Sequence, residues 1–214
     1  MKLYSYFRSS AAYRVRIALE LKGLVYDYAP VHLLAGGGQQ YQPAYREVNR
    51  AALVPTLEAD GLVLQQSMAI IEYLDETHPE PALLPASPAE RARVRTIAQA
   101  IACEIHPLNN LRVLKYLKHQ LGVDDAAKDG WYRHWIGVGL AAVEAMLADD
   151  ARTGRFCHGD SPTLADCCLV PQVFNAERFG CQLDAFPRIL QVVENCRALP
   201  AFERAAPGVQ PDAA

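Results

Sequence analysis

The sequence predicts an α/β domain with a mixed four-stranded sheet, followed by an all-helical domain. Strand-like and helix-like patterns alternate up to about residue 80, and no strand pattern recurs after it. Four prolines from Pro79 to Pro88 interrupt any periodic pattern there and mark a boundary. Beyond them, apolar residues recur at helical spacing. We therefore expect two domains, over residues 1–80 and 88–214.

The first domain should begin with a strand, a helix and a second strand. Residues 2–6 have strand character, Ser9 or Ser10 can cap a helix over residues 11–22, and Gly23 can end it. Residues 25–31 form the next expected strand. Two strands joined through a helix run parallel with a right-handed crossover, so these elements should form a parallel pair.

The rest of the first domain should be a loop, a hairpin and a helix. The glycines at 36–38 lack the Gly-Lys-Ser/Thr ending of a phosphate-binding loop, so we expect a connector there. Residues 54–64 predict two strands joined by an Asp60-Gly61 turn, with Pro55 at the entry of the first. Ser67 should cap the next helix, which stops at His78-Pro79.

The second domain should be a helical bundle. Residues 89–121 form a long amphipathic stretch that we expect Pro107 to kink. Further on, Thr163 and Asp166 have the spacing of a capping box, which predicts a helix running toward Arg178. This order of elements is that of a thioredoxin-like domain followed by a helical bundle.

The composition and charge of the chain exclude several classes of function. Hydrophobic residues at 51% and charged residues at 21% are typical of a globular protein, and a net charge of −3 argues against nucleic-acid binding. Arg8 interrupts the apolar core that a secretory signal needs, and no apolar run is long enough for a bilayer, so we expect a cytoplasmic protein with no membrane partner. The six cysteines, all from Cys103 onward, show no metal spacing and no Cys-x-x-Cys pair. We expect no metal.

One run near the start of the chain reads Tyr4-Ser5-Tyr6-Phe7-Arg8-Ser9-Ser10-Ala11-Ala12-Tyr13-Arg14-Val15-Arg16-Ile17-Ala18-Leu19. This run resembles the signature of zeta-class glutathione transferases. Further matching blocks lie, in the right order, at residues 37–40, 53–57, 66–74 and 169–179. The resemblance covers essentially the whole chain and implies the glutathione-transferase fold, glutathione as cofactor and a homodimer. It also implies a cis–trans isomerase acting on maleylacetoacetate, with maleylpyruvate isomerisation or a general glutathione transferase or peroxidase activity as alternatives.

The chain departs from the family pattern in two places. Ala11 stands where the motif usually has a cysteine, so any assisting role of that cysteine is absent. The usual Asn-Pro before the Val-Pro strand is here Asn49-Arg50, which we interpret as a tolerated change in a loop.

The expected chemistry needs a thiolate. The glutathione thiol should have a pKa near about 8.5, and a helix N-terminus lowers such a pKa because its free N–H groups favour negative charge. Ser9 and Ser10 lie where that terminus is expected, and either hydroxyl could donate to the thiolate or act only as an N-cap. Addition of the thiolate makes the substrate's double bond temporarily single, so that the resulting enolate can rotate and then expel the thiolate.

Other residues are assigned to glutathione by the resemblance. The Val54-Pro55 bond should be cis and expose the Val54 backbone to the cysteinyl part, although Pro55 could simply start a strand. Gln66 and Ser67, at a helix N-terminus, suit the γ-glutamyl carboxylate, and Gln40 the glycine end. His106 and Asn110 match positions that contact glutathione, with His106 reaching the neighbouring subunit's ligand, although His106 could instead line the kink without any ligand.

Positive charge is needed for the developing enolate and for a dicarboxylate substrate. Arg8 follows the first strand, and the resemblance assigns Arg112 and Arg178 to the same cleft; any one of them could instead be a solvated surface charge. A thiol–disulfide oxidoreductase is disfavoured because no cysteine precedes Cys103. A noncatalytic binding protein with this fold would have no need for the serines and glutamines above.

Overall fold

The computed structural model describes residues 1–213, and its contacts divide the chain into two compact units. The first unit comprises Met1–Leu83 together with the residues from Arg197 onward, and the second is Leu84–Cys196. The expected helical domain over 88–214 differs from this division in its last segment. That segment belongs to the first unit, where its helix α9 (Pro200–Ala205) packs against α1 (Ser10–Leu21).

The first unit contains a four-stranded mixed sheet in the order β2-β1-β3-β4. Strand β1 (Lys2–Ser5) runs parallel to β2 (Asp27–Pro30) and antiparallel to β3 (Thr56–Ala59), which pairs with β4 (Leu62–Gln65). This confirms the predicted thioredoxin-like arrangement. The register pairs Leu3 with Leu57, and both side chains are fully buried, so the two central strands anchor the core.

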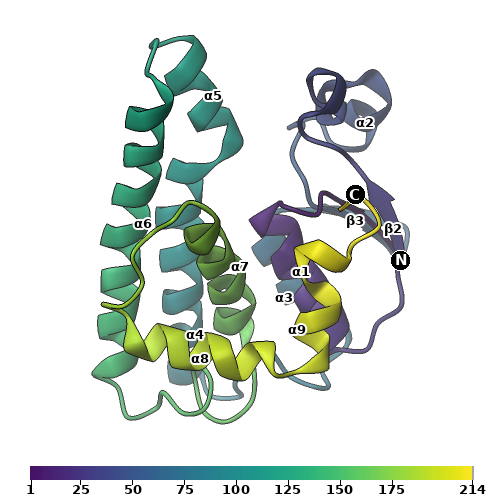
Figure 1. The fold of residues 1–214 in the computed structure, drawn as a ribbon. Coiled ribbons are helices and arrows are strands. Elements are labelled where there is room, and N and C mark those ends of the chain that lie inside the picture. Colours follow the sequence, from purple (N-terminus) through teal and green to yellow (C-terminus); the bar gives the residue numbers. More distant parts are fainter. Residues whose placement is uncertain (214) are drawn as a thin grey trace. The chain divides into compact units, whose positions relative to one another are not determined.

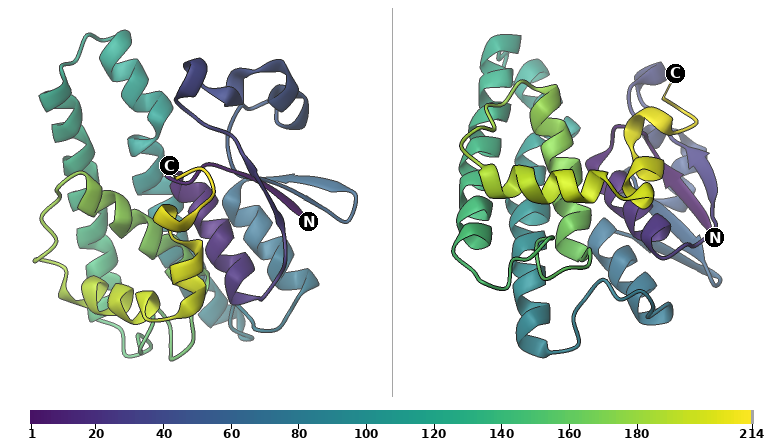
Figure 2. Two further views of the ribbon diagram at one scale, coloured as in Figure 1. Left: turned by 45° about the vertical axis from the view of Figure 1, so that its right-hand side comes forward. Right: turned by 60° about the horizontal axis from the view of Figure 1, so that its bottom comes forward.

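Helices cover this sheet, with α1 packed against α3 (Ser67–Thr77) and α9 while α2 (Pro43–Val48) lies apart from them (Figure 1). In two further views the strands lie beside α1, and β1 starts at the N-terminus (Figure 2). Ile17 of α1 and Ile70 of α3 are fully buried, so each helix turns an apolar face inward. This burial fixes where the N-termini of α1 and α3 stand on the sheet.

Local sequence signals explain most of these boundaries. Asp60 and Gly61 have φ of 52° and 77°, the left-handed pair that a tight hairpin of the type I′ class requires. Ser9 caps α1, and Gly23, at φ of 64°, follows its end. The expectation that Ser67 caps the following helix is wrong. Ser67 is the first residue of α3, and Gln66, with a left-handed φ of 69°, occupies the cap position.

The second unit consists of helices. They are α4 (Pro88–Gln99), α5 (Leu111–His119), α6 (Asp125–Ala148), α7 (Leu164–Arg178) and α8 (Pro187–Arg197). The stretch expected as one kinked helix is instead interrupted between α4 and α5 by a π-helical turn over Ala100–Ile105 and a 3₁₀ turn over His106–Asn109. Pro107 lies in the 3₁₀ turn, where its missing N–H is tolerated.

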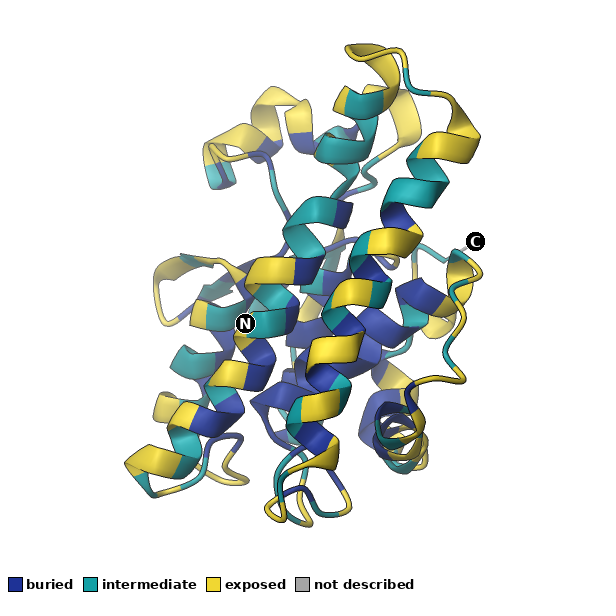
Figure 3. Ribbon diagram, turned by 90° about the vertical axis from the view of Figure 1, so that its left-hand side faces the viewer, coloured by how far each residue is buried: buried dark blue, intermediate teal, exposed yellow. Residues whose placement is uncertain are grey.

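The core of the second unit forms around α4, α6 and α7. Buried residues of α6 recur every three or four positions on one face, whereas its other face is exposed (Figure 3). The predicted start of α7 is confirmed, because the Asp166 carboxylate accepts hydrogen bonds from the Thr163 amide and hydroxyl, both at 2.8 Å. Complete burial raises the pKa of Asp166, and the amides that donate to it oppose that rise.

Candidate active site

The N-terminus of α1 is prepared to interact with an anion. The Ser9 Oγ accepts a hydrogen bond from the Ala12 amide at 3.2 Å, which leaves the hydroxyl proton of Ser9 available to donate. Ser9 is half-buried, whereas Ser10, the first residue of the helix, is only 5% exposed. A partly accessible hydroxyl proton at a helix N-terminus suits a thiolate, and Ser9 meets that description better than Ser10.

A tight turn carries Arg8 next to this serine. The Ser9 amide donates to the Tyr6 carbonyl at 2.9 Å and closes the turn. Arg8 is exposed, and its guanidinium carbon lies 4.7 Å from the centre of the Phe7 ring, a cation–π distance. The charged group therefore stands at the surface beside the start of α1.

Arg16 holds this turn from beneath, a role that the sequence analysis missed. Its side chain is fully buried, and it donates from Nη2 to the Phe7 carbonyl at 3.0 Å and from Nη1 to the Tyr6 carbonyl at 3.4 Å and the Ser5 hydroxyl at 3.1 Å. Burial lowers the pKa of the guanidinium. Its only signal in the sequence is a charged residue on the apolar face of a helix.

The Val54-Pro55 bond is cis, as the resemblance implies. The residues around it are tied together by two buried side chains: the Leu53 carbonyl accepts from the Tyr45 hydroxyl at 2.6 Å and from the Asn49 amide at 2.9 Å. Both side chains also reach the Thr56 hydroxyl at 3.0 Å, on the other side of the proline. The departure from the family pattern lies at Arg50, whereas Asn49, which was assigned no role from the sequence, braces the bond.

Hydrophobic contacts join this bond to the turn that precedes α1. Phe7, Tyr45 and Val54 belong to one buried cluster, which also includes Tyr6 and Val31. Burial raises the pKa of Tyr45, so its hydroxyl remains protonated and able to donate. The turn that carries Arg8 and Ser9 is thus connected to Val54 through the Phe7 side chain, within the first unit.

The N-terminus of α3 has the features of a carboxylate site. Gln66 is exposed, and its side chain accepts no hydrogen bond from the first backbone amides of the helix. Arg14 reaches across from α1, and its Nη1 donates to the Ser67 hydroxyl at 3.3 Å. A helix N-terminus with a guanidinium beside it favours a bound carboxylate.

Gln40 has an unfilled hydrogen-bonding position. It is 3% exposed, its Nε2 donates to the Leu33 carbonyl at 3.3 Å, and its buried Oε1 has no partner among the described residues. A peptide N–H, such as glutathione carries, would satisfy it. His32 braces the loop before it, because its Nδ1 accepts from the Leu34 and Ala35 amides at 3.1 and 2.8 Å.

Three predicted residues lie close together in the second unit. His106 opens the 3₁₀ turn, and Asn110 caps α5 by accepting the Arg112 amide at 3.1 Å. Arg112 is exposed in the first turn of α5. Whether these residues contact glutathione or substrate stays a prediction.

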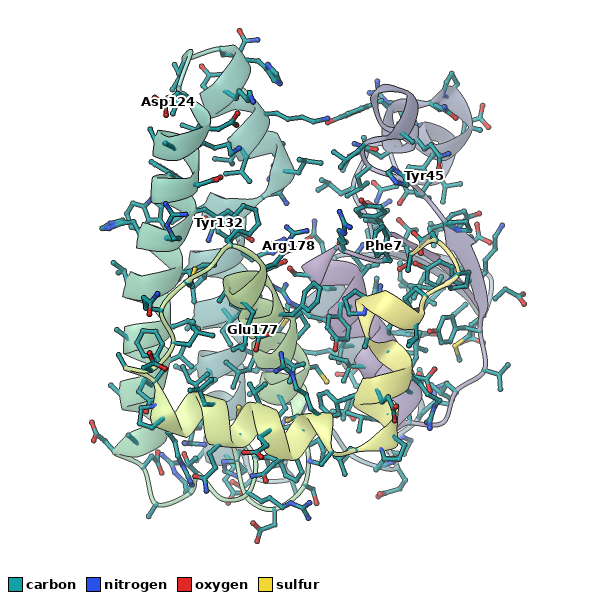
Figure 4. All side chains as sticks on the ribbon, in the orientation of Figure 1. Phe7, Tyr45, Asp124, Tyr132, Glu177 and Arg178 are labelled. Carbon is teal, nitrogen blue, oxygen red and sulfur yellow. The ribbon has the colours of Figure 1, made fainter. Side chains whose placement is uncertain are left out.

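Arg178 ends α7 and lies next to two stacked aromatic rings. The Tyr132 and Phe179 rings stack with centroids 3.6 Å apart, and the Arg178 guanidinium carbon lies 4.9 Å from the Phe179 centroid. Tyr132 and Arg178 project toward each other from α6 and α7 (Figure 4). Burial raises the pKa of Tyr132 to about 12, and the nearby Arg178 charge opposes that rise.

Other kinds of site were also sought. Over residues 1–213, no cluster of histidine, cysteine, aspartate or glutamate side chains could hold a metal ion. None of the helices in the described part of the chain has the length and apolar character needed to cross a bilayer. All six cysteines are free thiols, and Cys103 alone among them is exposed.

Comparison with known proteins places these features in a family. Residues 3–82 match the family model of the glutathione S-transferase N-terminal domain. A probable maleylacetoacetate isomerase of Vibrio cholerae is 52% identical, over 99% of this chain and 97% of its own length. Among solved structures, a maleylpyruvate isomerase described as a bacterial zeta-class glutathione S-transferase is 50% identical with a TM-score of 0.97, and both chains are covered completely.

A further solved structure was obtained with ligands. It is a maleylacetoacetate isomerase of Methylobacterium extorquens AM1 with bound malonate and glutathione, 40% identical with a TM-score of 0.95, and again both chains are covered completely. Glutathione is thus a ligand of this fold in a relative. The chain belongs to the glutathione S-transferase family, in the zeta class that includes the maleylacetoacetate and maleylpyruvate isomerases.

Proposed function

We propose that this enzyme is a glutathione-dependent cis–trans isomerase that converts maleylacetoacetate into fumarylacetoacetate. The observation that carries the proposal is the Ser9 hydroxyl, which accepts from the Ala12 amide and so has its proton free to donate at the N-terminus of α1. Relatives named for this reaction support the substrate class.

The residues of the first unit would bind glutathione along its length. The α3 N-terminus with Gln66 and Ser67 suits the γ-glutamyl carboxylate, because helix amides and the nearby Arg14 favour an anion. The Val54 backbone beside the cis bond suits the cysteinyl part, and the buried Gln40 Oε1 suits a peptide N–H nearer the glycine end. The Ser9 hydroxyl would then donate to the sulfur of glutathione.

When bound, glutathione supplies a thiolate that adds reversibly to the substrate and makes its double bond temporarily single. The helix amides and the Ser9 hydroxyl favour the ionised form of the sulfur, because both place positive partial charge beside it. Arg8 would stabilise the negative charge that develops on the substrate's carbonyl oxygen. Arg112 and Arg178 would bind the substrate carboxylates.

Maleylpyruvate is the alternative substrate, since it presents similar charges and a similar double bond. The solved relative that carries the maleylpyruvate isomerase name supports this alternative as strongly as the other names support the first. Conjugation or peroxidase chemistry would use the same thiolate. We further propose a cytoplasmic homodimer, in which His106 and Asn110 contact glutathione and His106 reaches the ligand of the partner subunit.

The test mixes the purified enzyme separately with maleylacetoacetate and with maleylpyruvate, and supplies glutathione in small molar amounts relative to substrate. Many turnovers per glutathione, with the trans isomer identified by NMR, would establish isomerisation, and the ratio of the kcat/KM values would choose the substrate. Turnover of neither, with conjugation of ordinary electrophiles, would contradict the proposal.

The role of Arg8 has its own test. Arg8→Ala should lose most of the isomerase turnover, by about 100-fold, because an oxyanion loses its cationic partner. Glutathione affinity should change little, since the binding roles fall on other residues. Arg46→Ala, which removes an exposed arginine of α2 in the same unit, is the matched control. Undiminished turnover of Arg8→Ala would remove its assigned role.

A further inference from the structure

The described chain ends in a segment that returns to the first unit. This returning segment, residues 207–213, begins with the 3₁₀ turn Pro207–Val209 and lies beside the strands of that unit (Figure 1). The Gln210 side chain anchors it, because its Nε2 donates to the Arg204 and Ala206 carbonyls at 2.8 and 2.9 Å. The segment is therefore fixed to the end of α9.

One carboxylate of this segment reaches the turn that precedes α1. Asp212 Oδ2 accepts a hydrogen bond from the Phe7 amide at 3.1 Å, across 205 positions of the sequence. Asp212 Oδ1 accepts from the Tyr28 hydroxyl of β2 at 2.5 Å. The next residue, Ala213, packs against the apolar cluster that contains Phe7 and Val54. Asp212 thus joins the returning segment, β2 and the turn.

The same turn is held on its other side by Arg16, which donates to the Tyr6 and Phe7 carbonyls. Arg16 Nε also donates to the Ala205 carbonyl at 3.0 Å, so the guanidinium ties the turn to α9. The Arg16 guanidinium thus holds the carbonyl oxygens of the turn, and the Asp212 carboxylate holds the Phe7 N–H. Both links lead to the part of the chain after Arg197.

We propose that Asp212 is a positioning residue, whose carboxylate, held by Tyr28, fixes the turn so that Arg8 and Ser9 stand in their working positions. The inference rests on the roles proposed for Arg8 and Ser9. It assigns to the returning segment the task of completing the active site of the first unit.

The chemistry of the side chain supports this assignment. Asp212 has two acceptor oxygens and uses one for each donor, whereas asparagine would offer one oxygen and alanine none. Burial, and after it the bond to Asp212, raises the pKa of Tyr28, so its hydroxyl stays a donor over the range in which enzymes work. The Tyr28 hydroxyl donates to Oδ1 of Asp212, and this bond orients Oδ2 toward the Phe7 amide.

The first arm of the test needs neither substrate nor glutathione. Hydrogen–deuterium exchange of the peptide over residues 4–12 should be about 10-fold faster in Asp212→Ala than in the wild type, because a lost bond of ordinary net strength exposes the Phe7 amide. Tyr28→Phe should give a smaller increase. Tyr73→Phe, which removes a similar hydroxyl bond to the Asp60 carboxylate at 2.7 Å on the exposed surface, should leave this peptide unchanged.

The second arm measures steady-state isomerisation. Asp212→Ala should lower kcat about 10-fold while the KM for glutathione stays within about 3-fold, because the displaced groups act on the sulfur and the substrate. Asp212→Asn should recover part of that loss, since its oxygen can still accept from the Phe7 amide. A wild type that isomerises neither substrate would refute the proposed function, while the exchange arm would still decide whether Asp212 holds the turn.

Three results would overturn the inference. One is wild-type exchange and wild-type kcat in Asp212→Ala. A second is equal damage from Asp212→Asn and Asp212→Ala, since the negative charge and not the acceptor would then matter. The third is faster exchange over the whole first unit together with a lowered melting temperature and an unchanged kcat, which describes a residue that only stabilises the fold.

Discussion

Removal of the Asn49 side chain tests how the fold supports the glutathione site. Asn49 is 2% exposed, and its Nδ2 donates to the Leu53 carbonyl and the Thr56 hydroxyl while its Oδ1 accepts from the Ala51 amide at 2.9 Å. Each such bond contributes about 1 kcal/mol net. The bond to Ala51 is worth less, because Ala51 is exposed and water can replace Asn49 there. Asn49→Ala should therefore lower the free energy of unfolding by about 2–3 kcal/mol.

The expected loss stays moderate because Tyr45 still donates to the Leu53 carbonyl and still shares a hydrogen bond with the Thr56 hydroxyl, so neither group loses its last partner. Urea unfolding measures the stability. Calorimetric titration measures glutathione affinity, which should fall about 5- to 10-fold because the Val54 backbone is less firmly placed. Asn195→Ala, which removes one exposed bond to the Arg155 carbonyl, is the matched control. A change in stability below about 0.5 kcal/mol would refute the bracing role of Asn49.

Two other substitutions test the second unit. A Cβ at Gly139 would stand 2.2 Å from Ile105 Cγ1, so Gly139→Ala should lower the unfolding free energy by about 1–3 kcal/mol. The control Gly137→Ala, which faces open space in the same helix, should raise it by up to about 1 kcal/mol. Equal effects of the two substitutions would contradict this contact. Tyr132 has a pKa raised from 10.0 to about 12, so the folded state resists losing this proton and stability should fall as the pH rises from 10 to 12, by roughly 3 kcal/mol in total. Tyr132→Phe should make the fall of stability with pH shallower by this contribution, while the other buried tyrosines keep theirs, and an unchanged slope would contradict the shift.

Signals that act over a few residues made much of the fold predictable. The Asp60-Gly61 turn specifies its hairpin because both residues adopt left-handed backbone angles readily. Ser9 and Thr163 precede apolar helical patterns, and both stand at helix starts in the structure. The family signature at residues 4–19 predicted the fold class and glutathione as the ligand.

Interactions between distant residues were not predictable in the same way. Asp212 and Phe7 meet across 205 positions, and nothing in the sequence near Asp212 distinguishes it from an exposed carboxylate. Asn49 was assigned no role from the sequence because its partners become neighbours only when the chain folds back on itself. In the stretch over 89–121, helical periodicity concealed the π-helical turn, since its apolar residues Ile101 and Ile105 keep a spacing of four.

The central claim is that the start of α1 and the Ser9 hydroxyl turn bound glutathione into a thiolate. The most direct measurement is a pH titration of the ultraviolet absorbance of the thiolate in the enzyme–glutathione complex, compared between the wild type and Ser9→Ala. The wild type should ionise the thiol about one to two pH units below its unbound value of about 8.5, and Ser9→Ala should reverse most of that shift. A thiol that ionises near its unbound pKa in the wild type, or equally low in both proteins, would contradict the account.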